Sequence, residues 1–255
     1  MSDARDTSRA VLGTEALSRH FAGLVAVREV SISLQQGELH AVIGPNGAGK
    51  TTLVNMLSGE IRPTAGRIEL EGRQVAGEPA WRMTRLGVGR SFQRTNIFAS
   101  LSVLENARLA AQAVGRVRRN ASGRPWCEVE LVDRALAALD RVGLSEVAPR
   151  IAGTLSHGEQ RQLEIAMALA GEPKVLLLDE PLAGMGPEES QRMTALLAGL
   201  TRKHAVLLIE HDMDCVFAVA DWMTVMAEGA VIAEGRPDAI RANTAVQDAY
   251  LGGHV

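Results

Sequence analysis

The first ninety residues alternate short apolar runs with turn residues. These runs predict strands over residues 11–17, 27–34 and 38–43, which we expect to be antiparallel, with a turn at 36–37. A further strand is predicted over 67–72, and an alternating run over 86–93 ends on the polar amide of Gln93. We therefore expect this part of the chain to form sheet.

From about Gln93 to Gly153 the apolar residues follow helical spacing. One helix is predicted to begin at 101–106, a second carries an apolar stripe from Val132 to Val142, and a third follows Leu155. Between the first two, Gly, Ser and Pro mark a loop over 116–125. Its four arginines could contact phosphate or lipid headgroups, but such runs are usually solvated, and we favour that interpretation.

Two fully apolar runs, 175–178 and 205–209, end in charged residues. Runs of this kind suit central parallel strands, and ligands gather at the carboxyl ends of such strands. The first run leads into Asp179 and Glu180, and the second leads into Glu210 and His211. A hairpin over 222–234 and a last helix over 237–250 are predicted to complete the chain.

The strongest motif lies between the predicted strand at 39–43 and a helix that follows it. It fits the pattern G-x-x-x-x-G-K-[ST] of a phosphate-binding loop and comprises Gly44, Pro45, Asn46, Gly47, Ala48, Gly49, Lys50, Thr51 and Thr52. The glycines let backbone N–H groups turn inward around phosphates, and the helix N-terminus adds the positive end of a dipole. We expect Lys50 to reach the terminal phosphates and Thr51 to offer a hydroxyl to Mg²⁺. A glycine-rich turn that binds nothing is the alternative.

Single residues elsewhere are weaker candidates. Phe21 precedes the loop and is either an adenine platform or a core side chain. Asp179 is placed to reach Mg²⁺ or its water, and Glu180 to act on an attacking water as general base. His211 ends a buried strand, which favours a functional role over a structural one.

The segment 155–160 leads into a helix with a polar start. Ser156 and Glu159 match the capping box S-x-x-E, and Gly158 lies between them. A capped helix start that contains glycine is a second potential anion site. An ordinary helix cap is the alternative, and from these residues alone it is favoured.

Composition narrows the class of partner and the compartment. Twenty-seven basic and 30 acidic residues give a net charge of −3, which does not favour a nucleic-acid partner. Cys127 and Cys215 lack metal-ligand spacing and are interpreted as free thiols in a reducing compartment. The chain starts with polar residues, and no apolar run approaches the ~20 residues needed to cross a bilayer. We therefore expect a protein that is cytosolic by itself and that needs a separate partner for any membrane role.

Taken in order, these motifs resemble the ATP-binding cassette of ABC transporters across essentially the whole chain. The phosphate loop at 44–52, Gln93, the signature segment at 155–160, the strand at 176–180 and His211 follow the family's order. The resemblance implies an α/β P-loop NTPase of the ABC ATPase fold, with a mixed sheet core, an antiparallel β subdomain and an inserted helical subdomain. It implies one nucleotide-binding domain over 1–255, with a core lobe at about 11–92 and 172–255 and a helical lobe at about 93–171.

The same resemblance implies roles for the residues around ATP. Phe21 would stack on adenine, and Gln93 would contact Mg²⁺ and the attacking water. Glu180 would be the catalytic carboxylate of an ATPase, and His211 would contact the γ-phosphate. Asp179 and Thr51 would complete the Mg²⁺ site.

In the signature segment, the resemblance implies contacts with the ATP of a second chain bound head to tail. Ser156 and Gly158 match the family's phosphate-facing positions, and Glu159 accompanies them. His157 departs from the usual L-S-G-G-Q. Gly186 stands where the family often has aspartate, so the cross-dimer contact made there cannot be carried over.

A finer resemblance rests on the stretches 155–166, 183–189 and 246–252. They are similar to the ATPase of branched-chain (hydrophobic) amino-acid uptake systems, and the lipopolysaccharide-export ATPase shares much of the pattern. The first implies ATP binding and hydrolysis coupled to import of such an amino acid or a similar small solute. The second implies an exporter. A soluble ABC ATPase without a transport role is disfavoured because the chain has one cassette and no sustained heptads.

The resemblance also implies partners. We expect a second ATPase subunit, identical or related, and two transmembrane permease subunits that dock near residues 93–98. A solute-binding protein completes such a complex, and no nucleic acid takes part. The expected location is the cytoplasmic face of the inner membrane, as a peripheral subunit.

Overall fold

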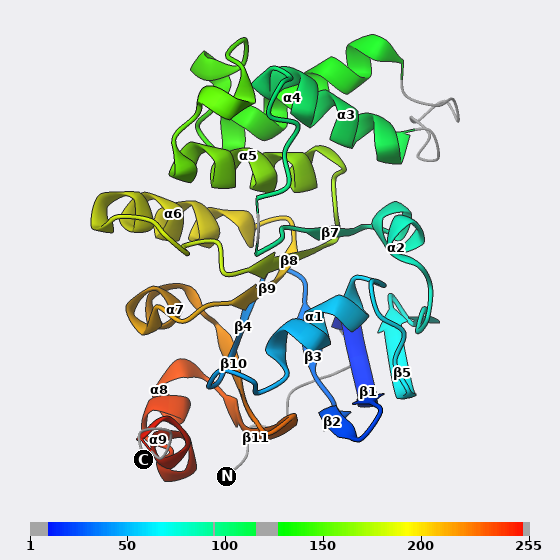
Figure 1. Cartoon of the computed structure of the whole chain (residues 1–255), viewed down its shortest axis with the longest axis vertical. Coiled ribbons are helices and arrows are strands. Elements are labelled where there is room, and N and C mark those ends of the chain that lie inside the picture. The colour runs from blue at the N-terminus through cyan, green and yellow to red at the C-terminus, as the bar shows by residue number, and fades with distance from the viewer. Residues whose placement is uncertain (1–9, 94, 116–126, 252–255) are drawn as a thin grey trace.

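The computed structural model describes residues 10–93, 95–115 and 127–251 (Figure 1). Its centre is a sheet in the order β11-β10-β4-β9-β8-β7. Strands β10, β4, β9, β8 and β7 run parallel, and β11 pairs with β10 as an antiparallel hairpin. The strands are β4 (Leu39–Ile43), β7 (Val88–Arg90), β8 (Val175–Asp179), β9 (Ala205–Ile209), β10 (Trp222–Ala227) and β11 (Ala230–Gly235).

A second sheet packs beside the first and is antiparallel throughout. Its strands follow the order β2-β1-β5-β6, and β3 also pairs with β1. The bounds are β1 (Ala10–Phe21), β2 (Leu24–Val30), β3 (Ser33–Gln35), β5 (Ala65–Leu70) and β6 (Arg73–Gln74). Together with the central sheet and its flanking helices it forms what we call the core lobe.

Helices between β7 and β8 form a separate layer, the helical lobe, at the top of Figure 1. They are α3 (Val103–Gly115), α4 (Glu128–Arg141) and α5 (His157–Ala170), with short 3-10 turns at Ser145–Val147 and Ala152–Thr154. The remaining helices belong to the core lobe: α1 (Lys50–Leu57), α2 (Ala80–Leu86), α6 (Pro187–Leu200), α7 (Met213–Val219), α8 (Pro237–Arg241) and α9 (Thr244–Leu251).

The central strands divide their side chains between two hydrophobic cores. On β8, Leu176 and Leu178 pack with α3 to α7, whereas Val175 and Leu177 pack with α1 and the antiparallel sheet. Strand β9 alternates in the same way. Because side chains of a strand point to opposite faces in turn, a strand covered on both faces must be apolar at every position. This explains the unbroken apolar runs in the sequence.

Two predictions for the N-terminal strands were wrong. The strand expected over 38–43 is not antiparallel, because β4 lies between β10 and β9 and runs parallel to both. An apolar run reveals burial but not which neighbour a strand pairs with. The run 27–34 is two strands rather than one, since the chain leaves β2 after Val30 and starts β3 at Ser33 to pair with β1.

Three smaller predictions also needed correction. Gln93 does not end its strand, because β7 stops at Arg90. Phe21 is not in a link but is the last residue of β1, where it pairs with Leu24. The C-terminal helix is divided into α8 and α9, because the side chain of Asn243 accepts a hydrogen bond from the N–H of Ala245 at 2.9 Å and starts a new helix.

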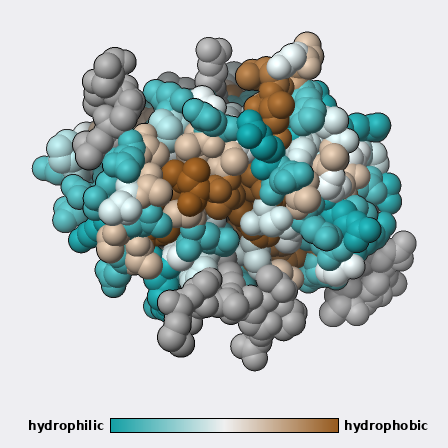
Figure 2. Space-filling view, turned by 90° about the horizontal axis from the view of Figure 1, so that it is seen from below, coloured by the Kyte–Doolittle hydropathy of each residue, from teal (hydrophilic) through white to brown (hydrophobic). Residues whose placement is uncertain are grey.

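The end of the molecule formed by β11, α8 and α9 presents a mostly hydrophilic face with a hydrophobic group near its centre (Figure 2). Among the described strands, the exposed large hydrophobic residues are Phe21 on β1, Leu24 on β2 and Ile232 on β11. Among the described residues, no helix is long and apolar enough to span a bilayer. The arginine-rich loop predicted at 116–125 lies outside the described residues.

Candidate nucleotide-binding site

The phosphate loop connects β4 to α1, as the sequence predicted. Its glycines allow contacts that a side chain would prevent. A Cβ at Gly49, where φ is +98°, would lie 2.3 Å from the carbonyl oxygen of Ala26, and a Cβ at Gly44 would lie 2.1 Å from that of Met226. Gly49 also precedes α1 without a side-chain cap. The first N–H groups of α1 therefore remain available to an anion, and the helix dipole favours negative charge there.

Lys50 is the first residue of α1 and is buried. Its Nζ donates to the carbonyl oxygens of Gly44 at 2.7 Å and Pro45 at 3.0 Å. Burial lowers the pKa of Lys50, and the nearby carboxylates of Glu180 and Asp179 oppose that shift. The ammonium is thus held over the loop by carbonyls, which a phosphate can replace as partners.

A cavity of about 710 Å³ opens above the loop, which is within the size range of small-ligand sites. Its lining unites segments that are far apart in sequence: Phe21, Leu24, Val25, Ala26, Arg28, Asn46, Gly47, Ala48, Gly49, Lys50, Thr51, Thr52, Gln93, Glu180, His211 and Glu228. Most of the residues predicted to bind or hydrolyse a nucleotide therefore share one cavity. Gly44 and Pro45 lie behind the Lys50 ammonium.

Phe21 contributes an aromatic ring at one end of this cavity. Phe21 is 38% exposed, which argues against a role as a core side chain. The guanidinium of Arg19 lies 4.4 Å from the ring centroid. Arg19 Nη1 also donates to the carbonyl oxygen of Arg62 at 3.0 Å. Arg19 thus holds the ring from one side, and the part of the ring that lines the cavity can stack on a base.

Three polar side chains meet at the carboxyl ends of β8 and β9. Glu180 Oε1 lies 2.5 Å from His211 Nε2, and Gln93 Nε2 donates to Glu180 Oε2 at 3.0 Å. Glu180 has a left-handed backbone, with φ at +52°, and its N–H donates to the carbonyl oxygen of Ile209 in β9. Such a backbone is unfavourable for a residue with a side chain and is retained where its surroundings fix it. A carboxylate aligned by an imidazole and an amide is suited to activating a water molecule.

Asp179 ends β8 beneath these residues and is 1% exposed. Neither carboxylate oxygen has a hydrogen-bond partner among the described residues, although Arg90 Nη2 lies 3.5 Å from Oδ2. Burial raises the pKa of Asp179, and Arg90 opposes the shift. Buried carboxylate oxygens that accept no hydrogen bond are rare, so this carboxylate fits a magnesium ion or its water ligands. Thr51 also lines the adjacent cavity. The described residues contain no cluster of three or more His, Cys, Asp or Glu that would hold a metal without a nucleotide.

Sequence reasoning missed several residues of this site. Val25, Ala26 and Arg28 on β2 line the cavity, as does Glu228 in the β10–β11 turn. Glu210 was seen only as the end of an apolar run, yet its buried carboxylate accepts from the N–H groups of Leu182 at 2.7 Å and His211 at 2.8 Å. It thereby ties the loop after β8 to the loop after β9. Its place beside His211 was the signal available in the sequence.

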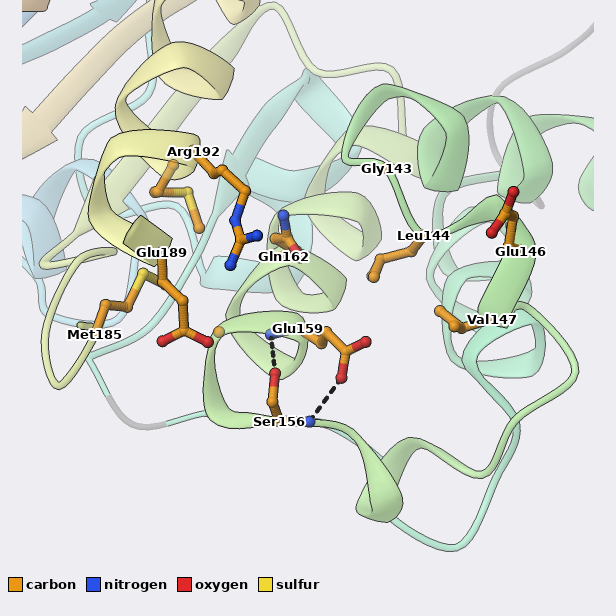
Figure 3. Close-up of a pocket in the computed structure, with 12 residues that line it drawn as sticks. Gly143, Leu144, Glu146, Val147, Ser156, Glu159, Gln162, Met185, Glu189 and Arg192 are labelled. Atoms are coloured by element: carbon orange, nitrogen blue, oxygen red, sulfur yellow. Dashed lines mark hydrogen bonds between the residues drawn. The ribbon is translucent and has the colours of Figure 1, made fainter. Parts of the chain in front are cut away.

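The signature residues lie elsewhere. Ser156 and Glu159 form the predicted capping box of α5: Glu159 N donates to Ser156 Oγ at 3.2 Å, and Ser156 N donates to Glu159 Oε2 at 2.7 Å (Figure 3). Together with Gly158 they line a pocket of about 400 Å³ between the helical lobe and α6. None of the three lines the phosphate-loop cavity. The carboxylate of Glu159 is used in the helix cap.

The fold and this site define an ATP-binding cassette: a phosphate loop on a mixed sheet, an antiparallel subdomain, and a helical lobe inserted before the carboxylate-bearing strand. The family model "ABC transporter" matches residues 27–183, more than half of the chain, and the chain belongs to this family. A second model, "Branched-chain amino acid ATP-binding cassette transporter", matches residues 230–255.

Curated relatives extend the similarity over the whole chain. The high-affinity branched-chain amino acid transport ATP-binding protein BraF of Pseudomonas aeruginosa is 41% identical, over 96% of this chain and 99% of its own. The corresponding protein LivG of Escherichia coli K12 is 39% identical over the same shares.

A solved structure confirms the fold. The ADP conformation of MJ1267, an ATP-binding cassette of an ABC transporter, is 30% identical, with a TM-score of 0.83 over 95% of this chain and 99% of that one. The predicted family and fold class are therefore confirmed.

Proposed function

We propose that this chain is the ATP-hydrolysing subunit of an ABC importer for branched-chain or similar hydrophobic amino acids. One observation carries the enzymatic part: Gln93, Glu180 and His211 converge on the rim of the phosphate-loop cavity, with a water-activating carboxylate at their centre. The named function of the BraF and LivG relatives, and the match of residues 230–255, support the substrate class.

In the proposed reaction the triphosphate lies on backbone N–H groups of the phosphate loop, and Lys50 exchanges its carbonyl partners for phosphate oxygens. Phe21 stacks on the adenine. Asp179 and Thr51 would hold Mg²⁺, which neutralises charge on the phosphates when bound. Glu180 orients and deprotonates the attacking water, and His211 holds the carboxylate on one side while Gln93 holds it on the other.

A second copy of the cassette completes the site. The signature residues of one chain lie on a different pocket from its own phosphate loop, so within one chain they contact no bound triphosphate. Two chains arranged head to tail would place each signature over the other chain's ATP. ATP then stabilises the closed dimer and hydrolysis releases it, and this difference in free energy is the output of the motor.

The surface after Gln93 is the proposed contact for permease subunits. A groove of about 240 Å³ between the lobes is lined mostly by apolar and small residues, including Phe92, Met167 and Ala168, and its polar lining includes Asn96. Phe98, at the other end of this segment, is 54% exposed. An apolar groove beside an exposed aromatic residue is typical of a helix-binding surface. We infer two permease subunits, a solute-binding protein and a peripheral position at the cytoplasmic face of the inner membrane.

The experiment is recovery of the tagged chain from detergent-solubilised membranes of its own organism, followed by identification of bound proteins. We expect permease subunits, and amino-acid-stimulated ATPase activity after reconstitution with them. Recovery of ribosomal or DNA-bound proteins alone would contradict the transport function. Recovery of a lipopolysaccharide permease would retain the ATPase motor and overturn the direction of transport.

A further inference from the structure

The chain passes from the core lobe to the helical lobe between two consecutive residues. The N–H of Ser91 donates to the carbonyl oxygen of Leu177 in β8 at 2.9 Å, so Ser91 still belongs to the central sheet. The next residue, Phe92, is held by α5. Its N–H donates to Glu164 Oε1 at 3.0 Å, and its carbonyl oxygen accepts from Arg161 Nη1 at 2.7 Å. The backbone of Gln93 therefore begins on the helical side of the boundary.

Arg161 and Glu164 act together on this segment. The second guanidinium nitrogen of Arg161, Nη2, donates to the carbonyl oxygen of Gln93. Arg161 Nη1 also lies 3.2 Å from Glu164 Oε2, so the pair occupies successive turns of α5 and spans the backbone of two residues. Arg161 is 5% exposed and Glu164 is 4% exposed. A buried ion pair is weak evidence for a stabilising role, because desolvation offsets its attraction, so its use is better sought in the geometry that it fixes.

Other contacts show that the attachment extends along the segment. Burial raises the pKa of Glu164, and the N–H groups of Phe92 and Asn96 oppose that shift. At the far end, Phe98 N donates to Asn106 Oδ1 on α3 at 2.7 Å, and Asn106 Nδ2 returns a bond to the carbonyl oxygen of Phe98 at 3.1 Å. Side chains of α5 and α3 therefore hold the two ends of the segment 92–98 by hydrogen bonds.

The side chain of Gln93 crosses back to the core lobe, where it contacts Glu180 at 3.0 Å. We propose that Arg161 and Glu164 are positioning residues that make Gln93 move with α5, so that the position of the helical lobe decides whether Gln93 reaches Glu180 and the attacking water. Helix α5 starts at the signature residues. Contact of that helix start with a second chain's ATP is therefore relayed to this chain's own hydrolytic carboxylate. This last step rests on the proposed head-to-tail dimer.

The test replaces the pair by apolar side chains of similar size, in Arg161→Met/Glu164→Leu, since such exchanges of buried ion pairs often preserve folding. The matched control is Glu105→Leu/Arg108→Met, another Arg–Glu pair in the helical lobe, on α3, whose Arg108 Nη2 and Glu105 Oε1 are 2.5 Å apart. We expect kcat for ATP to fall on the order of tenfold or more in the first variant, because a small misplacement of a catalytic group is costly. The KM for ATP should stay within about twofold, since the phosphate loop is untouched. The control should retain both values.

Two further measurements separate positioning from mere stability. Hydrogen exchange of the amides in the segment 92–98 should accelerate in the first variant and not in the control. The Hill coefficient for ATP should fall to 1 in the first variant. Unchanged kcat per folded molecule, or unchanged exchange in this segment, would overturn the proposal even if the melting temperature drops. If the wild type itself hydrolyses ATP without cooperativity, both the relay between chains and the proposed head-to-tail dimer are wrong. The positioning role of Arg161 and Glu164 is still decided by kcat and by hydrogen exchange.

Discussion

The phosphate-loop cavity and the signature pocket are both bordered by the start of a helix, yet one chain equips them very differently. The first brings together free N–H groups, the ammonium of Lys50, an aromatic ring and the carboxylate of Glu180. The second is lined by the carboxylates of Glu146, Glu159 and Glu189 and by one guanidinium, that of Arg192 (Figure 3). Three acidic groups against one basic group do not favour a triphosphate inside this second pocket.

The difference supports the proposal that the signature contacts a second chain's ATP through the outer surface of its helix start and not through a pocket of its own. Ser156 Oγ accepts a bond from Glu159 N, so its hydroxyl proton can point outward. The surface that binds ATP and the surface proposed to contact a second chain's ATP are therefore separate on one chain. Variants on the phosphate-loop side should therefore change ATP binding or turnover, whereas variants on the signature side should leave the ATP affinity of the single chain unchanged.

The largest effect is expected on the phosphate-loop side from Glu180→Gln. The amide keeps the size and polarity of the side chain but cannot take a proton, so turnover should fall by ~10²–10⁴-fold while ATP binding remains. The variant should also accumulate an ATP-bound dimer, visible by size-exclusion chromatography. Glu188→Gln on the exposed start of α6 is the matched control. Wild-type turnover in Glu180→Gln would remove Glu180 from the catalytic role.

Lys50→Ala should weaken Mg-ATP binding by about tenfold to a hundredfold, because a hydrogen bond to a charged group is worth about 1.5–3 kcal/mol.

Phe21→Ala should weaken binding less than Lys50→Ala and should reduce the preference for ATP over GTP, since stacking tolerates different base edges. Titration with a fluorescent ATP analogue measures both, with the exposed Lys203→Ala as control. Unchanged affinity in Phe21→Ala would show that the ring packs the fold and does not hold the base.

On the signature side, Ser156→Ala removes the cap of α5. The free energy of unfolding should fall by about 1 kcal/mol, as for other lost N-caps. ATP affinity of the single chain should not change, because Ser156 does not line the phosphate-loop cavity. Dimer-dependent turnover should fall. Urea denaturation and ATP titration are compared with Ser145→Ala, a nearby serine in the same lobe. A loss of ATP affinity in the single chain would show that the two surfaces are coupled within it.

The smallest effect is expected at a contact between the lobes that lies outside both pockets. His204, just before β9, accepts from Arg141 Nη1 of α4 at 3.2 Å when its Nδ1–H donates to the carbonyl oxygen of Pro173 at 2.7 Å. Burial lowers the pKa of His204, so the folded state favours the neutral ring.

As the pH falls below ~6.5, the ordinary pKa of histidine, the unfolded chain binds a proton that the folded chain resists. The contribution of His204 to the free energy of unfolding should therefore fall on acidification, by at most about 1.4 kcal/mol per pH unit. Urea denaturation at pH 7.5 and 5.5 should show a smaller change for His204→Asn than for the wild type. The exposed His20→Gln should behave like the wild type.

The sequence revealed those parts of the site that are contiguous or that end a strand. The phosphate loop is one uninterrupted motif, and the meeting of Glu180 with His211 follows from the shared edge of β8 and β9. Arg161 and Glu164 could not be found in this way, because two charged residues on a helix are usually on its solvated face. They are buried here because the segment after β7 lies across α5 and brings its own backbone groups as partners. Helices α2, α6 and α7 were also not predicted.

The helical lobe connects β7 to β8 along the chain. These strands are parallel neighbours, and Val88 pairs with Val175 while Arg90 pairs with Leu177, so the end of β7 and the start of β8 lie at opposite ends of the pair. Every such pair needs a crossover of about a dozen residues or more. The helical lobe is thus an enlarged form of a crossover that the parallel strands require. For the sheet itself, the crossover only has to be long enough to join β7 to β8. A chain in which one plain helix replaces the lobe should retain a nucleotide-binding domain. It should lose the signature residues and the attachment of Gln93 to α5.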